Sequence, residues 1–112
     1  MTMIREVVYL NRDNTVDLLL KSDGTAQALG STTRMVLSDT AGTWSIDSAD
    51  YPTAFDWATD GADGIVTMSL ADAFGAELVG SGQYTVSLVL YDATNTDGIV
   101  CGQFILRVRD DV

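Results

Sequence analysis

Two long stretches near the end of the chain alternate between apolar and polar residues with a period of two. They run from Gly82 to Tyr91 and from Ile99 to Arg109, and a polar segment over residues 92–98 separates them. This alternation is typical of a strand that is buried on one side, and the Asp, Asn and Gly of the separating segment are typical of a turn. The pattern predicts two antiparallel strands whose apolar side must be covered by a second layer of structure.

Shorter stretches of similar alternation, separated by turn residues, precede this pair. We expect these strands over residues 3–10, 15–21, 32–38, 43–48 and 65–70. One short helix is expected over residues 71–79, where Phe74 and Leu78 are spaced for one helical face. Strands at a spacing of roughly ten residues are typical of a sandwich. The sequence therefore predicts an all-β fold, an immunoglobulin-like antiparallel β-sandwich of about six to eight strands, as a single domain over residues 1–112, with 1–13 as an N-terminal arm or first strand.

The last of these stretches contains a glycine that predicts an irregular strand. A glycine inside a strand often marks a bulge or a large neighbouring side chain. If the alternation is unbroken, Gly102 shares one face with Val100, Phe104, Leu106 and Val108. The opposite face then carries Ile99, Cys101, Gln103, Ile105, Arg107 and Arg109. This opposite face is amphipathic, and we expect another chain to cover part of it.

The composition excludes several kinds of chemistry. The chain has sixteen acidic residues, fourteen of them Asp, against six Lys and Arg, and it has one Cys and no His. With one Cys and no His, a structural zinc site or a Cys–His nucleophile cannot be built within one chain. The net charge of −10 opposes contact with nucleic-acid phosphates and is expected chiefly to keep the protein soluble, with steering toward a basic partner as the alternative. No apolar run approaches a membrane span, and the start of the chain lacks a secretory leader, so no membrane partner is expected.

Three groups of residues offer some chemistry. The Asp-rich segments 92–98 and 60–64 carry oxygen ligands, but they lack the alternate spacing and the closing Glu of a calcium loop, so they are interpreted as turns. Cys101 has no nearby base and is interpreted as a small buried hydrophobe. An aromatic cluster resembles a sugar platform, with core packing as the alternative, and it consists of Tyr51, Phe55, Asp56 and Trp57. We therefore expect no enzyme activity, no cofactor and no metal.

The few arginines lie near the two ends of the chain. Arg107 and Arg109 share a face of the last predicted strand, and Arg5 and Arg12 lie near the start. If the first and last strands are close, these side chains form the one basic patch of an acidic protein. Such a patch would fit an acidic surface on a neighbouring copy and favour self-assembly. The alternative is that the arginines are scattered and solvated.

Two segments resemble small β-sandwich domains of tailed-phage virions. The first is residues 14–25, an extended strand and a turn, which leads into a Thr-rich strand that ends at Val36 and Leu37. The second is the closing pair of strands, with its segments 82–92, 97–100 and 103–108. The nearest family is the amino-terminal domain of siphophage baseplate upper proteins and related tail, neck or head-fibre attachment proteins. Members of that family commonly continue into a coiled coil or receptor-binding region, whereas this sequence stops at Val112.

The resemblance implies a non-enzymatic structural protein of the virion, synthesised in the host cytoplasm, that docks onto other virion proteins. Capsid decoration, a collar or neck component, and a tail or baseplate attachment module are the roles it implies, and we expect a homo-oligomer. Docking is expected at sandwich edges, because an edge strand has unpaired backbone groups. The candidate interface residues are Ile4, Val8, Ile105, Arg107 and Arg109. The alternative function is a carbohydrate-binding or adhesive module that uses the aromatic cluster.

Overall fold

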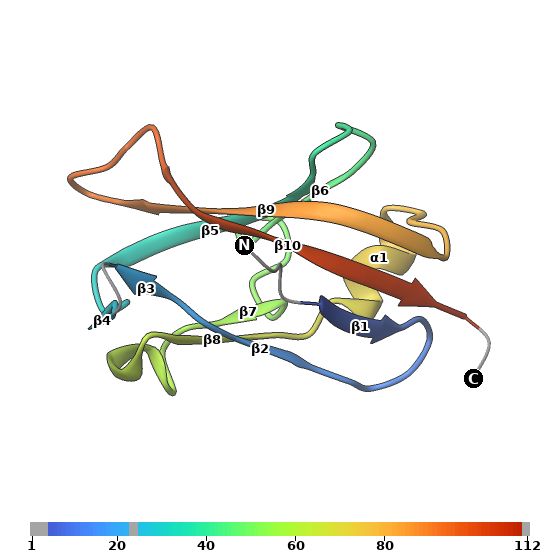
Figure 1. Cartoon of the computed structure of the whole chain (residues 1–112), viewed down its shortest axis with the longest axis horizontal. Coiled ribbons are helices and arrows are strands. Elements are labelled where there is room, and N and C mark those ends of the chain that lie inside the picture. The colour runs from blue at the N-terminus through green and yellow to red at the C-terminus, as the bar shows by residue number, and fades with distance from the viewer. Residues whose placement is uncertain (1–4, 23–24, 111–112) are drawn as a thin grey trace.

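The chain folds as two β-sheets that pack face to face (Figure 1). The computed structural model describes residues 5–22 and 25–110. Among these residues, the larger sheet has five strands, the smaller has three, and a two-stranded ribbon follows the first strand of the smaller sheet. The predicted all-β sandwich is therefore confirmed, with eight strands in its two main sheets and one short α-helix.

The larger sheet contains both of the long predicted strands. Its order is β1-β10-β9-β5-β6, and its strands are β1 (Arg5–Tyr9), β5 (Thr32–Asp39), β6 (Ser45–Asp47), β9 (Gly82–Asp92) and β10 (Ile99–Arg109). β9 and β10 have eleven residues each and pair in antiparallel fashion. β1 pairs with β10 in parallel, with Arg5 beside Ile105, so the first and last strands are neighbours.

The smaller sheet covers the inner side of the larger one. Its order is β2-β8-β7, and its strands are β2 (Val16–Leu19), β7 (Phe55–Asp56) and β8 (Ile65–Met68). The ribbon consists of β3 (Lys21–Ser22) and β4 (Thr25–Ala26), and a 3₁₀ turn, η1 (Gly61–Asp63), precedes β8. The helix α1 (Ala71–Ala76) lies between the two layers at one end of the sandwich (Figure 1).

The inward positions of both sheets form one hydrophobic core. Apolar side chains from β5, β6, β8, β9 and β10 are almost entirely buried there, among them Met35, Leu37, Ile46, Val66, Met68, Val86, Leu88 and Leu106. Helix α1 adds Phe74, whose ring lies 5.0 Å from that of Trp44, and Trp44 in turn lies 5.6 Å from Tyr84, both edge-on. These aromatic contacts close the end of the core.

The helix ends at Ala76, three residues earlier than predicted. Leu78 adopts a left-handed φ of 56°, and the Val79 N–H donates to the Phe74 carbonyl at 2.9 Å. This bond is typical of a helix C-terminus at which a left-handed residue, usually glycine, reverses the chain. The reversal buries Val79 in the core and leaves the Leu78 side chain 89% exposed. The prediction that Phe74 and Leu78 share one helical face is therefore wrong, because the chain reverses at Leu78 and buries Val79 instead.

The bulge predicted at Gly102 is present, and it reverses the faces of the residues before it. The register between β10 and β9 shifts between Val100 and Gly102, so that Cys101 is an extra residue. Val100 lies opposite Val89 and is 64% exposed, whereas Phe104 is 4% exposed. The prediction that Val100 and Phe104 share a face is wrong, because one extra residue moves a period-two pattern to the other side.

Gly64 and Gly42 form a matched pair that tests how closely the neighbouring backbone approaches a glycine, because both have a left-handed φ, of 80° and 79°. A Cβ on Gly64 would lie 2.9 Å from the Leu20 carbonyl oxygen and 3.0 Å from the Gln27 nitrogen, whereas a Cβ on Gly42 would meet nothing within 4 Å. We expect Gly42→Ala to lower the free energy of unfolding by about 1 kcal/mol, the cost of the left-handed φ alone. Gly64→Ala should lower it by about 3 kcal/mol, because the neighbouring backbone must also move. Urea unfolding measures both, and equal losses would contradict the close approach.

Candidate docking surface

The larger sheet has one face that points away from the smaller sheet, and we call it the outer face. Residues directly opposite one another in neighbouring strands share a face, so the register assigns alternate residues of all five strands to it. From β1 and β10 it takes Arg5, Val7, Tyr9, Val100, Gln103, Ile105, Arg107 and Arg109. From β9, β5 and β6 it takes Thr85, Ser87, Val89, Tyr91, Arg34, Val36, Ser38 and Asp47.

The outer face is basic although the chain is acidic. Four of the six basic residues lie on it, and Asp47 is the one acid that the register of the described strands assigns to it. Arg34 Nε donates to the two carboxylate oxygens of Asp47 at 2.9 and 3.0 Å, and Arg34 Nη2 also contacts this carboxylate. The hydrogen bonds from Arg34 lower the pKa of Asp47, so the one acid of this face is ionised and paired at neutral pH. Arg5, Arg107 and Arg109 then give the face its positive sign.

Two of the four arginines of the outer face, Arg34 and Arg109, lie over tyrosine rings of the same face. Arg34 Cζ is 4.7 Å from the centre of the Tyr91 ring, and Arg109 Cζ is 6.0 Å from the centre of the Tyr9 ring. The ring faces attract the guanidinium groups and restrict their movement. A guanidinium that is already oriented loses less entropy when it binds a carboxylate with two hydrogen bonds.

A row of valines crosses the outer face near the β9–β10 turn, and Arg107 lies toward the other end of β10. Val36 of β5 lies beside Val89 of β9, and Val89 lies opposite Val100 of β10. Val100 is 64% exposed, and Val7 of β1 is 37% exposed beside Arg107. Contiguous apolar side chains on the surface of a soluble protein often mark a contact site. Apolar residues together with arginines are also common in protein–protein interfaces.

The structure separates the five predicted interface residues. Ile105, Arg107 and Arg109 lie on the outer face, and the backbone of this part of β10 is paired with β1. Val8 is 1% exposed, so a partner cannot reach it, and this residue must be corrected to a core position. It faces inward because it alternates with the outward residues of β1. Ile4 lies outside the described residues.

The sequence analysis missed the part of the outer face that comes from β5 and β9. Arg34 and Val36 alternate with buried Met35 and Leu37, and this alternation could have marked them as outward. Their neighbours could not be identified from it, because β5 lies beside β9 only in the folded sheet. Arg12, which was grouped with the other arginines, is in the loop between β1 and β2 instead.

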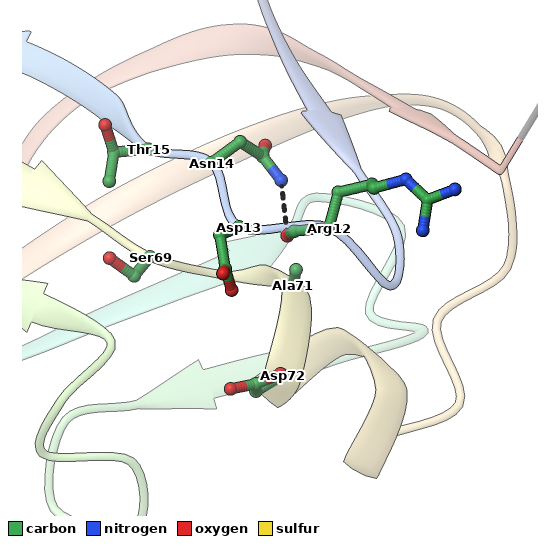
Figure 2. Close-up of a pocket in the computed structure, with 7 residues that line it drawn as sticks. All are labelled: Arg12, Asp13, Asn14, Thr15, Ser69, Ala71 and Asp72. Atoms are coloured by element: carbon green, nitrogen blue, oxygen red, sulfur yellow. Dashed lines mark hydrogen bonds between the residues drawn. The ribbon is translucent and has the colours of Figure 1, made fainter. Parts of the chain in front are cut away.

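Arg12 lines a hollow of about 340 Å³ between the β1–β2 loop and the start of α1 (Figure 2). Asn14 holds this loop, because its Nδ2 donates to the carbonyl oxygens of Tyr9 and Arg12, both at 2.8 Å. Figure 2 shows the Arg12 guanidinium directed away from the carboxylates of Asp13 and Asp72. The described residues contain no group of three or more His, Cys, Asp or Glu arranged to hold a metal ion. The carboxylates of Asp13 and Asp72 therefore line this hollow, and the Arg12 guanidinium does not point toward them.

The aromatic cluster is divided between the core and the surface. Phe55 is 5% exposed, and Tyr51 packs against the core. Asp56 accepts hydrogen bonds from the Ala58 N–H at 3.0 Å and from the Thr59 hydroxyl at 2.7 Å, and the Thr59 hydroxyl is the main reason that its pKa is lowered. Phe55, Asp56 and the half-buried Trp57 line a shallow hollow of about 550 Å³, whereas Tyr51 does not.

The Asp-rich segment between β9 and β10 has the hydrogen bonds of a turn. Asp92 Oδ1 accepts from the backbone N–H groups of Thr94 at 3.0 Å and Asn95 at 2.7 Å. The bond from Asn95 is the main reason that the pKa of Asp92 is lowered. Its carboxylate is therefore already bound within the turn, as the interpretation from turn chemistry requires. Cys101 is half-buried, and burial raises the pKa of its thiol.

No known family model matches this sequence, and neither a curated protein nor a solved structure is significantly similar to it. Within residues 5–22 and 25–110, no helix is long and apolar enough to cross a membrane.

The pairing of Arg34 with Asp47 can be tested through its dependence on pH. The hydrogen bonds lower the folded-state pKa of Asp47, so their contribution is present above the unfolded pKa of about 4 and is lost as the pH falls through the lower folded value. We expect a double-mutant cycle of Arg34→Met and Asp47→Asn, followed by urea unfolding, to show favourable coupling at pH 7. The coupling should disappear near pH 2, and the same coupling at both pH values would contradict the ion pair.

Proposed function

We propose that this protein is a non-enzymatic structural component of a tailed-phage virion that docks through its outer face. The roles in question are capsid decoration, collar or neck component, and tail or baseplate attachment module. The observation that carries the proposal is that four of the six basic residues and a row of valines lie on one sheet face of an acidic chain. Scattered solvation of the arginines would not produce this grouping.

We further propose that the sandwich is immunoglobulin-like, as the virion resemblance implies. The strand orders β1-β10-β9-β5-β6 and β2-β8-β7 support this, because they correspond to the two sheets of a variable-type immunoglobulin domain. The Tyr84 hydroxyl, near the start of β9, donates to the Gly80 carbonyl at 2.7 Å, which corresponds to the tyrosine corner of such domains. The buried Val86 stands where antibody domains have a disulfide cysteine.

The valines and arginines of the outer face determine which kind of partner surface would complement it. Burial of the valine row provides affinity in proportion to the apolar area removed from water, and the arginines of the same face attract carboxylates and set the orientation. The complementary partner is therefore a protein surface that combines an apolar patch with carboxylates. Arg109 already lies over the Tyr9 ring, so its guanidinium needs little reorganisation on binding.

The proposal predicts that the protein is a stoichiometric part of purified particles and that a charge reversal on the outer face removes it. Arg107→Glu changes an exposed residue of this face, and Lys21→Glu is the matched control, because Lys21 is exposed on β3, away from the face. We expect Arg107→Glu to reduce incorporation at least tenfold, about 1.4 kcal/mol of docking free energy, and Lys21→Glu to leave it unchanged. Quantitative mass spectrometry of particles made with each variant measures incorporation.

Two outcomes of this experiment would count against the proposal. Absence of the wild-type protein from purified particles would remove the virion role. Equal incorporation of the Arg107→Glu and Lys21→Glu proteins, both with the circular dichroism of the wild type, would remove the outer face as the docking site.

The second candidate function is carbohydrate binding, and the observation that favours it is the shallow hollow lined by Trp57 and Asp56. Against it, the Asp56 carboxylate already accepts hydrogen bonds from Ala58 and Thr59. Since docking is the better supported function, we expect oligosaccharides to leave the tryptophan fluorescence unchanged and Trp57→Ala to leave particle incorporation unchanged. A saturable fluorescence change that Trp57→Ala abolishes would favour the sugar-binding function instead.

A further inference from the structure

The face of the smaller sheet that points away from the core has the opposite charge to the outer face. Asp17 of β2 and Asp56 of β7 both pair with Thr67 of β8, so the three residues share this face, which we call the acidic face. Among the described residues, the exposed aspartates on this face or next to the ends of its strands include Asp13, Asp17, Asp56, Asp60, Asp63 and Asp72, the last of these in α1. The two remaining basic residues of the chain, Arg12 and Lys21, are too few to neutralise them.

The acidic face also has an apolar patch. Leu19 lies opposite Ile65 in the register of β2 with β8. Leu19 is 48% exposed and Ile65 is half-buried, while Leu18 and Val66 beside them are in the core. The acidic face therefore combines a small apolar patch, at one end of β2 and β8, with carboxylates, and this is the composition that the outer face requires of a partner.

We propose that the partner of the outer face is the acidic face of a second copy of this chain. The two faces lie on opposite sides of the sandwich (Figure 1), so each copy can use one face for the copy before it and the other for the copy after it. Such a contact between unlike surfaces is heterologous and produces a ring if the rotation closes, or an open stack if it does not. This inference rests on the docking role proposed for the outer face, and it names the partner.

Charge favours this pairing over the two symmetric ones. Contact between two outer faces would bring Arg5, Arg107 and Arg109 of one copy toward the same residues of the other, and contact between two acidic faces would bring Asp17 and Asp56 together. Like charges in contact across an interface cost several kcal/mol. Only the pairing of unlike faces places arginines against aspartates.

The test measures self-association of the purified protein by light scattering across a concentration series. We expect the average mass of the wild type to rise above 12.0 kDa in low salt, and to fall toward it as added salt screens the charges. Arg107→Asp on the outer face and Asp17→Arg on the acidic face should each weaken association at least tenfold. The matched controls Ala76→Asp and Glu77→Arg change exposed residues at the end of α1, outside both faces, and should associate like the wild type.

Mixing the two face variants distinguishes unlike from like pairing. The Arg107→Asp protein retains its acidic face, and the Asp17→Arg protein retains its outer face, so an equimolar mixture should form complexes that neither protein forms alone. A wild type that stays at 12.0 kDa at every concentration would overturn the inference, as would face variants that associate as strongly as the controls. Failure of the mixture to recover association would overturn the pairing of unlike faces.

The outcomes also separate this inference from the proposed function. A monomeric wild type together with loss of Arg107→Glu from particles would mean that the outer face docks on a different virion protein, and only this inference would fail. Self-association as described, by a protein absent from purified particles, would mean that the virion role alone is wrong. All substitutions are at exposed positions, and circular dichroism checks that each variant is folded.

Discussion

The pairing of β9 with β10 is the constraint on which the rest of the structure depends. β5 joins one side of this pair and β1 joins the other, and the inward residues Val86, Leu88 and Leu106 are at most 1% exposed. Since side chains alternate along a strand, burial of these residues commits their neighbours to the outer face. The same pairing that builds the core therefore also assembles the surface that we propose for docking.

Two departures from regular geometry leave apolar side chains in solvent. The bulge at Cys101 turns Val100 outward, where it extends the row formed by Val36 and Val89. At the end of α1, the left-handed Leu78 directs Val79 into the core and remains exposed itself. The bulge adds to a surface that other residues already define, whereas the exposure of Leu78 follows from the way the chain reverses after the helix.

The outward sides of the two sheets carry opposite charges, although the net charge describes the chain as acidic. Asp56 and Asp92 end their strands, and their carboxylates accept hydrogen bonds from backbone N–H groups of the turns that follow. These turns lower the pKa values of the two aspartates and keep them charged. Most of the arginines lie on long strands instead, where the register places them on one face. A chain with a net charge of −10 can thus present a basic surface.

The sequence by itself determined the longer strands, the turns between them and the bulge, because alternation and turn residues are local properties of the chain. It did not predict β4 and β7, which have two residues each and are too short to show an alternating pattern. It also indicated that Ile105, Arg107 and Arg109 share a face. Only the tertiary structure decided that Arg5 and Arg34 join them, because strand order depends on which distant strands pair. It also decided that Val8 is in the core and that Val100 is exposed. Val8 is buried because the smaller sheet covers that side of β1. Val100 is exposed because the extra residue Cys101 moves it to the other face of β10.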